Sequence, residues 1–168
     1  MIINGVSKGY AMTGWRIGYS ATPLWLAKAC CKLQGQMTSG ANSIAQKAAV
    51  AALSSDGEYP KMMCQSFQKR RDLVVEKLKK IPGFDINVPQ GAFYVFPEIS
   101  KLIGKSFNGE AIKNSSDLAM FLLNTAHVAM VPGSAFGAEN YIRLSYAASE
   151  SELVESLNRV AKAVEQLK

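Results

Sequence analysis

Residues 7–19 read Ser-Lys-Gly-Tyr-Ala-Met-Thr-Gly-Trp-Arg-Ile-Gly-Tyr and are the most informative stretch of the chain. Lys8 comes shortly after an apolar run, residues 1–3, where a strand is expected to end, and Arg16 follows eight residues later between two glycines. An activated lysine amine forms imines with aldehydes. A guanidinium binds phosphate bidentately, and glycines allow the backbone to approach a ligand closely. The stretch therefore predicts a site for a cofactor that carries an aldehyde and a phosphate.

Each of these side chains also has a simpler interpretation. Lys8 alone could be one of the many solvated loop lysines. Arg16 could pair with a carboxylate elsewhere in a structural role. Ser7 could add a hydroxyl to the same phosphate, although from the residues alone stabilisation of the turn is slightly favoured.

Arg143 lies inside an expected strand, residues 141–146. Side chains alternate between the two faces of a strand, so Arg143 shares one face with Tyr141 and Ser145. A planar guanidinium in a fixed position matches a substrate carboxylate. The alternative is an ion pair on the face of the sheet.

Two segments with aromatic residues beside glycines, 91–94 and 131–137, are candidate walls of the site. Aromatic side chains at such positions also commonly belong to the core. His127 is the only histidine and is expected at the end of a helix, where a capping role is favoured over catalysis.

The expected elements alternate between strands and helices and indicate an α/β protein. The first portion, residues 1–57, should hold strands at 1–4 and 16–21, a helix from Pro23 to about residue 34 and an Ala-rich helix over 43–53. It ends in the turn cluster Ser-Ser-Asp-Gly. The second portion, residues 58–168, reads as a small domain of α+β character. It is expected to begin with a long helix over 58–81 and a hairpin of 84–88 with 92–96. A helix capped by Ser115 or Ser116, with Asp117 in its first turn, and strands at 128–131 and 141–146 should follow. The last helix should open with a Ser149–Glu152 capping box and carry an apolar stripe of Leu153, Leu157, Val160, Val164 and Leu167.

Composition excludes several functional classes. Hydrophobic residues make up 48% of the 168 residues, which is typical of a folded protein. The charge of +6 is dispersed, and the densest basic cluster, residues 69–71, is followed at once by Asp72, so we expect a solvated helix face and no nucleic-acid partner. No apolar run approaches the ~18 residues of a membrane span, and the N-terminus lacks a signal-peptide pattern.

The three cysteines are odd in number and form no Cys-x-x-Cys pair. They therefore indicate neither a metal site nor a disulfide scaffold, and reduced thiols in a cytoplasmic protein are expected. The chain also starts directly with a strand and a candidate active-site lysine, which suggests a piece of a longer protein. Exposed apolar patches are then expected in its first portion.

With these residues placed, the chain resembles the class I/II aminotransferases, pyridoxal-phosphate enzymes of fold type I, and in particular the bacterial aspartate aminotransferases. The motifs that carry the resemblance, in family order, are Asn-Gly-Val-Ser-Lys (4–8), Ala-Met-Thr-Gly-Trp-Arg-Ile-Gly-Tyr (11–19), Gln-Gly-Ala-Phe-Tyr (90–94), Pro-Gly-Ser-Ala-Phe-Gly (132–137) and Tyr-Ile-Arg-Leu-Ser (141–145). The resemblance covers nearly all of this chain but only the latter part of the family's length. It implies that residues 1–57 end the large cofactor-binding domain and that 58–168 form the small domain.

The resemblance also implies roles. Lys8 is the catalytic lysine that forms the imine with pyridoxal phosphate and moves a proton from the substrate α-carbon, and Arg16, with Ser7, binds the cofactor phosphate. Arg143 binds the substrate α-carboxylate, and Tyr94 and Phe136 lie near it. The substrates are an amino acid, aspartate by preference, and a 2-oxo acid, and the full-length protein is a homodimer.

The family's cofactor contacts from its N-terminal half have no counterpart in this sequence. We therefore expect the isolated 168-residue chain to be inactive. The alternatives are an aromatic or alanine aminotransferase or a lyase on the same scaffold, and a non-catalytic folded module.

Overall fold

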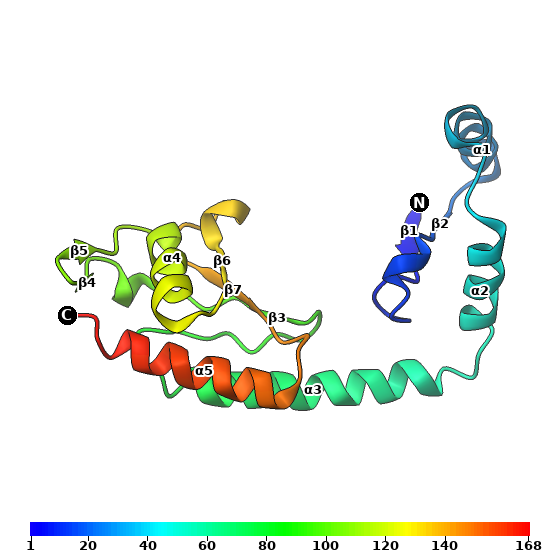
Figure 1. Ribbon diagram of the computed structural model, residues 1–168. Helices are drawn as coiled ribbons and strands as arrows, with labels where there is room; N and C mark the ends of the chain where they lie inside the picture. The colour runs from blue at the N-terminus through cyan, green and yellow to red at the C-terminus, as the bar shows by residue number, and fades with distance from the viewer. The chain divides into compact units, whose positions relative to one another are not determined.

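The computed structural model describes residues 1–168 and divides into two compact units, Met1–Cys64 and Gln65–Lys168. Figure 1 shows helices and strands in both units, which places the chain in the predicted α/β class. None of the helices combines the length and the apolar character that crossing a bilayer requires.

The first unit begins with an antiparallel pair of strands, β1 (Ile2–Gly5) and β2 (Gly18–Ala21), in which Gly5 is opposite Gly18. The connecting loop contains the short 3-10 helix η1 (Thr13–Trp15). Two helices follow, α1 (Leu24–Thr38) and α2 (Ser43–Leu53). All four expected elements are present, but β2 begins two residues later than expected, and α1 continues to Thr38, beyond the end expected near residue 34.

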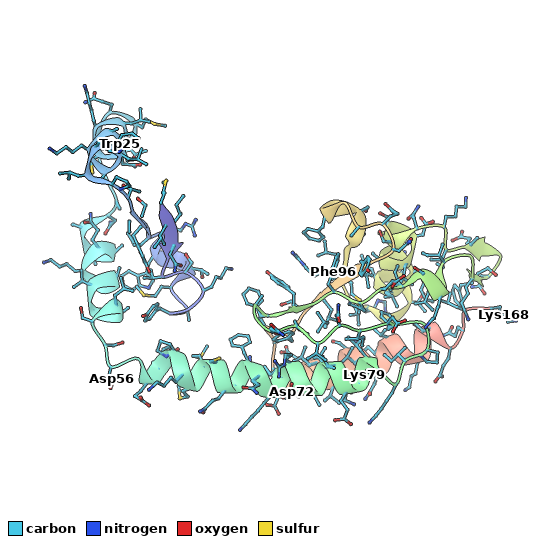
Figure 2. The ribbon with its side chains drawn as sticks, turned by 180° about the vertical axis from the view of Figure 1, so that it is seen from behind. Trp25, Asp56, Asp72, Lys79, Phe96 and Lys168 are labelled. Atoms are coloured by element: carbon cyan, nitrogen blue, oxygen red, sulfur yellow. The ribbon has the colours of Figure 1, made fainter.

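The core of the first unit is small. It consists of Val6, Met12, Ile17, Ala45 and Ala49. Many large apolar side chains of this unit are exposed instead, as expected for the first portion: Met1, Ile2, Ile3, Trp15, Tyr19, Leu24, Trp25, Leu33, Met37, Ile44, Val50, Leu53, Tyr59 and Met62. Figure 2 labels Trp25 on α1, a helix without a single buried residue.

Helix α3 (Glu58–Leu78) contains the boundary between the two units, which falls between Cys64 and Gln65. Its second half is apolar on one face and buries Val74 and Leu78. The helix ends at Leu78, three residues before the expected end, and a turn in which the Ile81 amide donates to the Leu78 carbonyl over 3.0 Å continues the chain. The division of domains at residues 57 and 58 stays a prediction.

The second unit is built on a three-stranded antiparallel sheet in the order β3 (Tyr94–Val95), β7 (Ile142–Ser145), β6 (Val131–Pro132). Helices α4 (Ser115–Ala126) and α5 (Glu150–Val164) contact each other, and α4 also contacts β6. The predicted alternation in β7 is confirmed, because Ile142 and Leu144 are buried whereas Arg143 is only partly buried. The predicted apolar stripe is buried at all five positions, although the last of them, Leu167, lies beyond the end of α5.

The predicted hairpin of residues 84–88 with 92–96 is wrong. No pairing joins the two segments: the one antiparallel bridge of the first segment runs from Asp85 to Glu98, which lies beyond the second segment. Tyr94 and Val95 pair instead with Ser145 and Leu144 of β7. Alternation within a segment does not specify which strand it pairs with, and here the hydrogen-bonded partner is a strand about fifty residues later in the chain.

Three smaller differences concern helix and strand ends. Asn114, not Ser115 or Ser116, caps α4, since its side chain accepts from the Asp117 amide over 2.9 Å. The strand expected at 128–131 is shorter and later, as β6. A further antiparallel pair, β4 (Ser106–Phe107) and β5 (Glu110–Ala111), was not expected, although its Asn-Gly turn is a strong hairpin signal. The Ser149–Glu152 capping box is confirmed.

Candidate functional site

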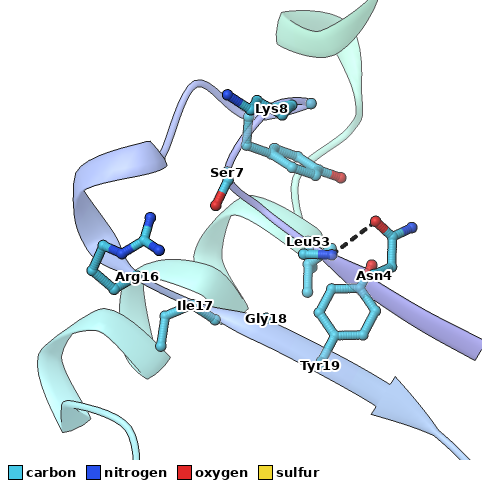
Figure 3. A pocket seen from close by; sticks show the side chains of 11 residues that line it. Asn4, Ser7, Lys8, Arg16, Ile17, Gly18, Tyr19 and Leu53 are labelled. Atoms are coloured by element: carbon cyan, nitrogen blue, oxygen red, sulfur yellow. Dashed lines mark hydrogen bonds between the residues drawn. The ribbon is translucent and has the colours of Figure 1, made fainter. Parts of the chain in front are cut away.

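A hollow in the first unit brings together three predicted site residues, Ser7, Lys8 and Arg16. Figure 3 shows them on the loop that leaves β1 and on the segment that enters β2. The complete lining is Asn4, Gly5, Ser7, Lys8, Gly9, Tyr10, Arg16, Ile17, Gly18, Tyr19 and Leu53. An amine, a guanidinium and a hydroxyl therefore face one open space.

The loop owes its shape to bonds at its base and along its length. Val6 is fully buried, and its amide donates to the Ile17 carbonyl over 3.4 Å. Its carbonyl accepts from the Tyr10 amide, and the Ala11 amide donates to the Lys8 carbonyl over 3.2 Å. Lys8 thus belongs to a hydrogen-bonded turn that continues directly from a strand, and its side chain is exposed to the hollow.

Arg16 ends η1 in a left-handed backbone conformation, with φ 55°. Residues other than glycine adopt this region rarely and at a cost of ~1–3 kcal/mol, and such residues concentrate at functional sites. Its Nη1 donates to the Thr13 carbonyl over 2.9 Å, and it makes no ion pair with any carboxylate. The structure therefore gives no support to the alternative of a structural ion pair for Arg16.

The donor set of this hollow fits pyridoxal phosphate. A primary amine suits the aldehyde, and a guanidinium with a neighbouring hydroxyl suits the phosphate. The charged side chains of the lining, Lys8 and Arg16, are both cationic, so the charge of the hollow suits an anion.

Arg143 lies in the second unit, between two aromatic rings. Its guanidinium carbon is 4.3 Å from the centre of the Tyr94 ring and 4.5 Å from that of Phe136. Arg143 makes no ion pair and no side-chain hydrogen bond, so the expected alternative of a salt bridge on the sheet face is not observed. Both rings lie within cation–π distance of the guanidinium, and its N–H groups make no hydrogen bond, so these donors remain for a ligand. We call Tyr94, Phe136 and Arg143 the aromatic clamp.

The two rings of the clamp come from different elements. Tyr94 is in β3, directly opposite Ser145 of β7. Phe136 ends the short 3-10 helix η3 (Gly133–Phe136) that follows β6, and it is half exposed. Phe96 supports this side of the clamp, because its ring meets that of Phe136 edge-on with centres 5.9 Å apart. Tyr94, Phe136 and Arg143 thus lie together in the second unit. Ser7, Lys8 and Arg16 lie together in the first unit.

His127 has the role that its position predicts. It is the C-cap of α4 in a left-handed conformation, with φ 54°, and its amide donates to the carbonyls of Leu122 and Leu123. Its place at the helix end thus has a structural reason.

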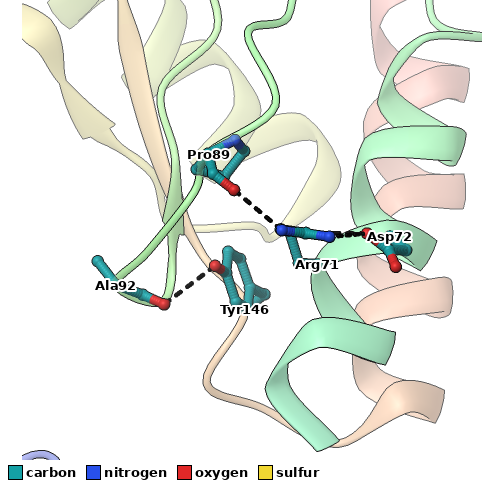
Figure 4. Close-up of polar contacts among 5 residues, drawn as sticks. All are labelled: Arg71, Asp72, Pro89, Ala92 and Tyr146. Atoms are coloured by element: carbon teal, nitrogen blue, oxygen red, sulfur yellow. Dashed lines mark hydrogen bonds and ion pairs between the residues drawn. The ribbon is translucent and has the colours of Figure 1, made fainter. Parts of the chain in front are cut away.

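Sequence reasoning missed a group of residues that hold the walls of the clamp. Ser115 is fully buried, and its hydroxyl accepts from the Ser134 amide, which ties α4 to η3. Arg71 and Tyr146 donate to carbonyls of the segment that precedes β3 (Figure 4). No local motif marks these contacts, because each joins segments distant in the sequence.

Comparison with known proteins identifies the relatives of the chain. The family model for aminotransferases of class I and II matches residues 1–160. The aspartate aminotransferase of Rhizobium meliloti strain 1021 is 51% identical over 168 residues, which are 99% of this chain and 41% of that protein. A bifunctional aspartate aminotransferase and glutamate/aspartate-prephenate aminotransferase of Petunia hybrida is 48% identical and covers 100% of this chain and 36% of its own length.

Solved structures agree. The crystal structure of the aspartate aminotransferase from Rhizobium meliloti superposes with a TM-score of 0.96 at 50% identity, covering 99% of this chain and 42% of that one. An aromatic aminotransferase from Pyrococcus horikoshii gives 0.87 at 35% identity, with coverages of 97% and 42%. The chain spans about two fifths of the length of the relatives it matches. The predicted fold is confirmed, and the chain belongs to the class I and II aminotransferase family.

Proposed function

We propose that the whole protein is a pyridoxal-phosphate-dependent aminotransferase that moves the amino group of aspartate to a 2-oxo acid. The observation that carries the proposal is the hollow that Ser7, Lys8 and Arg16 share. Family membership and relatives named as aspartate aminotransferases support it. Because the chain spans 41% of such a relative, the activity is proposed for the whole protein and not for these residues alone.

In this proposal the residues of the hollow hold the cofactor. The Lys8 amine would bind the aldehyde, and the Arg16 guanidinium would bind the phosphate with help from the Ser7 hydroxyl. When bound, pyridoxal phosphate supplies a conjugated ring that accepts electrons from the substrate α-carbon. Residues 1–57 would then be the last part of the cofactor-binding domain, and 58–168 the small domain.

Two further roles follow from the chemistry of transamination. The Lys8 Nζ takes a proton from the substrate α-carbon and delivers it again, as a general base and acid. Arg143 binds the α-carboxylate with the hydrogen-bonding edge that the aromatic clamp leaves uncovered. Tyr94 and Phe136 fix the plane of the guanidinium and keep water from its faces, which orients the substrate for proton transfer.

Reduction with borohydride tests the cofactor site directly. We expect the full-length protein to bind pyridoxal phosphate and, after reduction, to carry the added mass on the peptide that contains Lys8. Lys8→Ala should abolish both the adduct and the activity. Lys28→Ala, which removes an exposed lysine of α1, is the matched control and should change neither. An adduct on another lysine, or none, would contradict the proposal.

The substrate carboxylate is tested at Arg143. Hydrogen bonds to charged groups contribute ~1.5–3 kcal/mol each, and 1.4 kcal/mol is a factor of ten. Arg143→Leu should therefore raise KM for the amino acid by at least about tenfold, without loss of the Lys8 adduct. An unchanged KM would assign Arg143 to a purely structural role.

Amino-donor profiles decide between aspartate and the alternatives. Several relatives are named as aspartate/prephenate aminotransferases and one structure is that of an aromatic aminotransferase, so aspartate, glutamate, aromatic donors and alanine are the set to compare. A preference for an aromatic donor or alanine would overturn the aspartate assignment.

The isolated 168-residue chain should show no transamination, and robust activity from it would show that the remaining cofactor contacts are not needed.

Assembly and compartment complete the proposal. We expect the full-length protein to be a homodimer, as its membership of the family implies. A strictly monomeric full-length protein in light scattering at high concentration would contradict the expected homodimer. Three exposed free cysteines favour a reducing compartment such as the cytoplasm.

A further inference from the structure

The segment that leads into β3 has no regular structure and depends on two side chains. Between residues 86 and 92 the backbone takes part in two hydrogen bonds, and both come from side chains of other elements. Arg71 of α3 donates from Nη1 to the Pro89 carbonyl over 3.2 Å, and the Tyr146 hydroxyl donates to the Ala92 carbonyl over 3.0 Å (Figure 4). We call residues 89–92 the clamp turn.

Arg71 is held in place before it reaches the clamp turn. Its Nε and Nη2 both contact Oδ1 of Asp72, at 2.8 and 2.7 Å. The Arg71 side chain is 23% exposed, whereas that of Asp72 is 57% exposed, so the ion pair faces water and the bond to Pro89 is the more shielded contact. A bond with a charged donor in a partly buried position is stronger than a neutral, exposed one.

Tyr146 supports the other end of the same turn. It is 2% exposed, and burial raises the pKa of its phenol above the ordinary value, with the Arg71 charge acting in the opposite direction. The hydroxyl therefore stays protonated and able to donate at neutral pH. Its amide also donates to the Phe93 carbonyl over 2.9 Å, so Tyr146 binds two consecutive carbonyls of the segment.

The clamp turn determines where Tyr94 points. Ala92 has a left-handed backbone, with φ 60°, which a residue other than glycine keeps only where its surroundings impose it. Two residues later Tyr94 enters β3 and lies 4.3 Å beneath the Arg143 guanidinium. If Ala92 relaxed to an ordinary conformation, the chain would enter the strand in another direction and the ring would leave the guanidinium.

We propose that Arg71 and Tyr146 are positioning residues, which order the clamp turn and so keep Tyr94 against Arg143 in the geometry that receives a carboxylate. The role of Arg143 in this inference rests on the proposed function. Removal of either donor should lower the fraction of molecules with a formed clamp. The apparent Kd for a carboxylate rises in inverse proportion to that fraction, so a fall to one tenth gives a tenfold weaker ligand.

The test uses the full-length protein loaded with pyridoxal phosphate. Arg71→Met keeps the length of the side chain and removes the donor, and Tyr146→Phe removes only the hydroxyl. Succinate, a dicarboxylate without an amino group, is the probe in calorimetric titration, and hydrogen–deuterium exchange reports on peptides that cover 86–95. We expect about tenfold weaker succinate binding and faster exchange in this segment, with the Lys8 adduct unchanged.

Arg159→Met is the matched control, because Arg159 also pairs with a carboxylate on its own helix, Glu155, but lies on α5 away from the turn. It should alter neither readout. Arg71→Lys, which keeps a charged donor, should fall between the wild type and Arg71→Met. If Arg71→Met fails to fold, Tyr146→Phe decides with the same two readouts.

The outcomes separate the inference from the function on which it rests. Faster exchange with unchanged succinate affinity, or unchanged exchange, overturns the positioning role. If the wild type itself binds no succinate, or Arg143→Leu binds it as well as the wild type, the proposed function of Arg143 fails and the positioning role fails with it. A fall in thermal stability alone, without a local change in exchange, also overturns the inference.

Discussion

Gly133 should tolerate no side chain, and Gly133→Ala is the sharpest test of how the clamp is built. Gly133 is buried at the start of η3, and its φ is not positive, so the constraint is space alone. An added Cβ would lie 2.0 Å from the Ala138 carbonyl oxygen and 2.4 Å from that of Tyr141. Real Cβ atoms do not come closer than 3.0 Å, so a backbone group must move by about 1 Å.

That movement breaks hydrogen bonds of the same turn. The Gly133 amide donates to the Tyr141 carbonyl over 2.8 Å, and the Tyr141 amide donates to the Ala138 carbonyl over 3.1 Å. Two lost bonds cost about 1 kcal/mol each and overpacking costs ~1–3 kcal/mol. We therefore expect Gly133→Ala to lower the free energy of unfolding by about 3–5 kcal/mol.

Urea unfolding followed by circular dichroism measures this cost. Gly91→Ala is the control, because nothing lies within 4 Å of its Cβ and its φ is not positive. It should be neutral or slightly stabilising, by up to ~1 kcal/mol, since alanine has fewer conformations in the unfolded chain. If Gly133→Ala lowers the free energy of unfolding by less than about 1 kcal/mol, the backbone of η3 adjusts to the added methyl group, and the inference of a rigid turn beneath Phe136 is wrong.

Three further predictions concern the second unit and use the same unfolding measurement. Ser149→Ala removes the N-cap of α5 and should lower the free energy of unfolding by about 1 kcal/mol at neutral pH. Hydrogen bonds from Ser149 lower the pKa of Glu152 below 4.5, so they stabilise the fold above that pH. The difference in stability between wild type and variant should therefore shrink as the pH falls through the lowered pKa. Leu157→Ala should cost ~2–5 kcal/mol because Leu157 is 1% exposed, whereas Leu123→Ala, at 42% exposed, should cost under ~1 kcal/mol. Burial raises the pKa of Tyr146 above 10.0, so the protonated phenol stabilises the folded state fully below that pH. The free energy of unfolding should therefore fall as the pH rises beyond 10.0, and Tyr146→Phe should lack this contribution to the pH dependence.

Elements with a strong local signal could be predicted from the sequence. The helix over 43–53 has the predicted bounds, and α5 carries both its capping box and its apolar stripe. The strand around Arg143 was predictable because alternation fixes both faces at once. Where the signal was ambiguous the prediction failed: Asn114 and the two serines after it are all good caps, and only the structure shows which side chain reaches the Asp117 amide.

The candidate site divides in the same way. Ser7, Lys8 and Arg16 lie within ten residues, so their meeting in one hollow follows from a short loop between two paired strands. The partners of β3 could not be predicted, because the pairing of Tyr94 with Ser145 spans about fifty residues and no local pattern specifies it. Arg71 was invisible for a related reason: it occurs in a basic run that reads as a solvated helix face.

A guanidinium held by aromatic rings keeps its full positive charge, whereas one held by a carboxylate is neutralised. Arg143 therefore projects an uncompensated field, since no acidic side chain pairs with it. Such a field accelerates the encounter with anions and is screened over about 8 Å at physiological ionic strength. The arriving anion has no internal counter-ion to displace, so we expect its association rate to fall as the ionic strength rises.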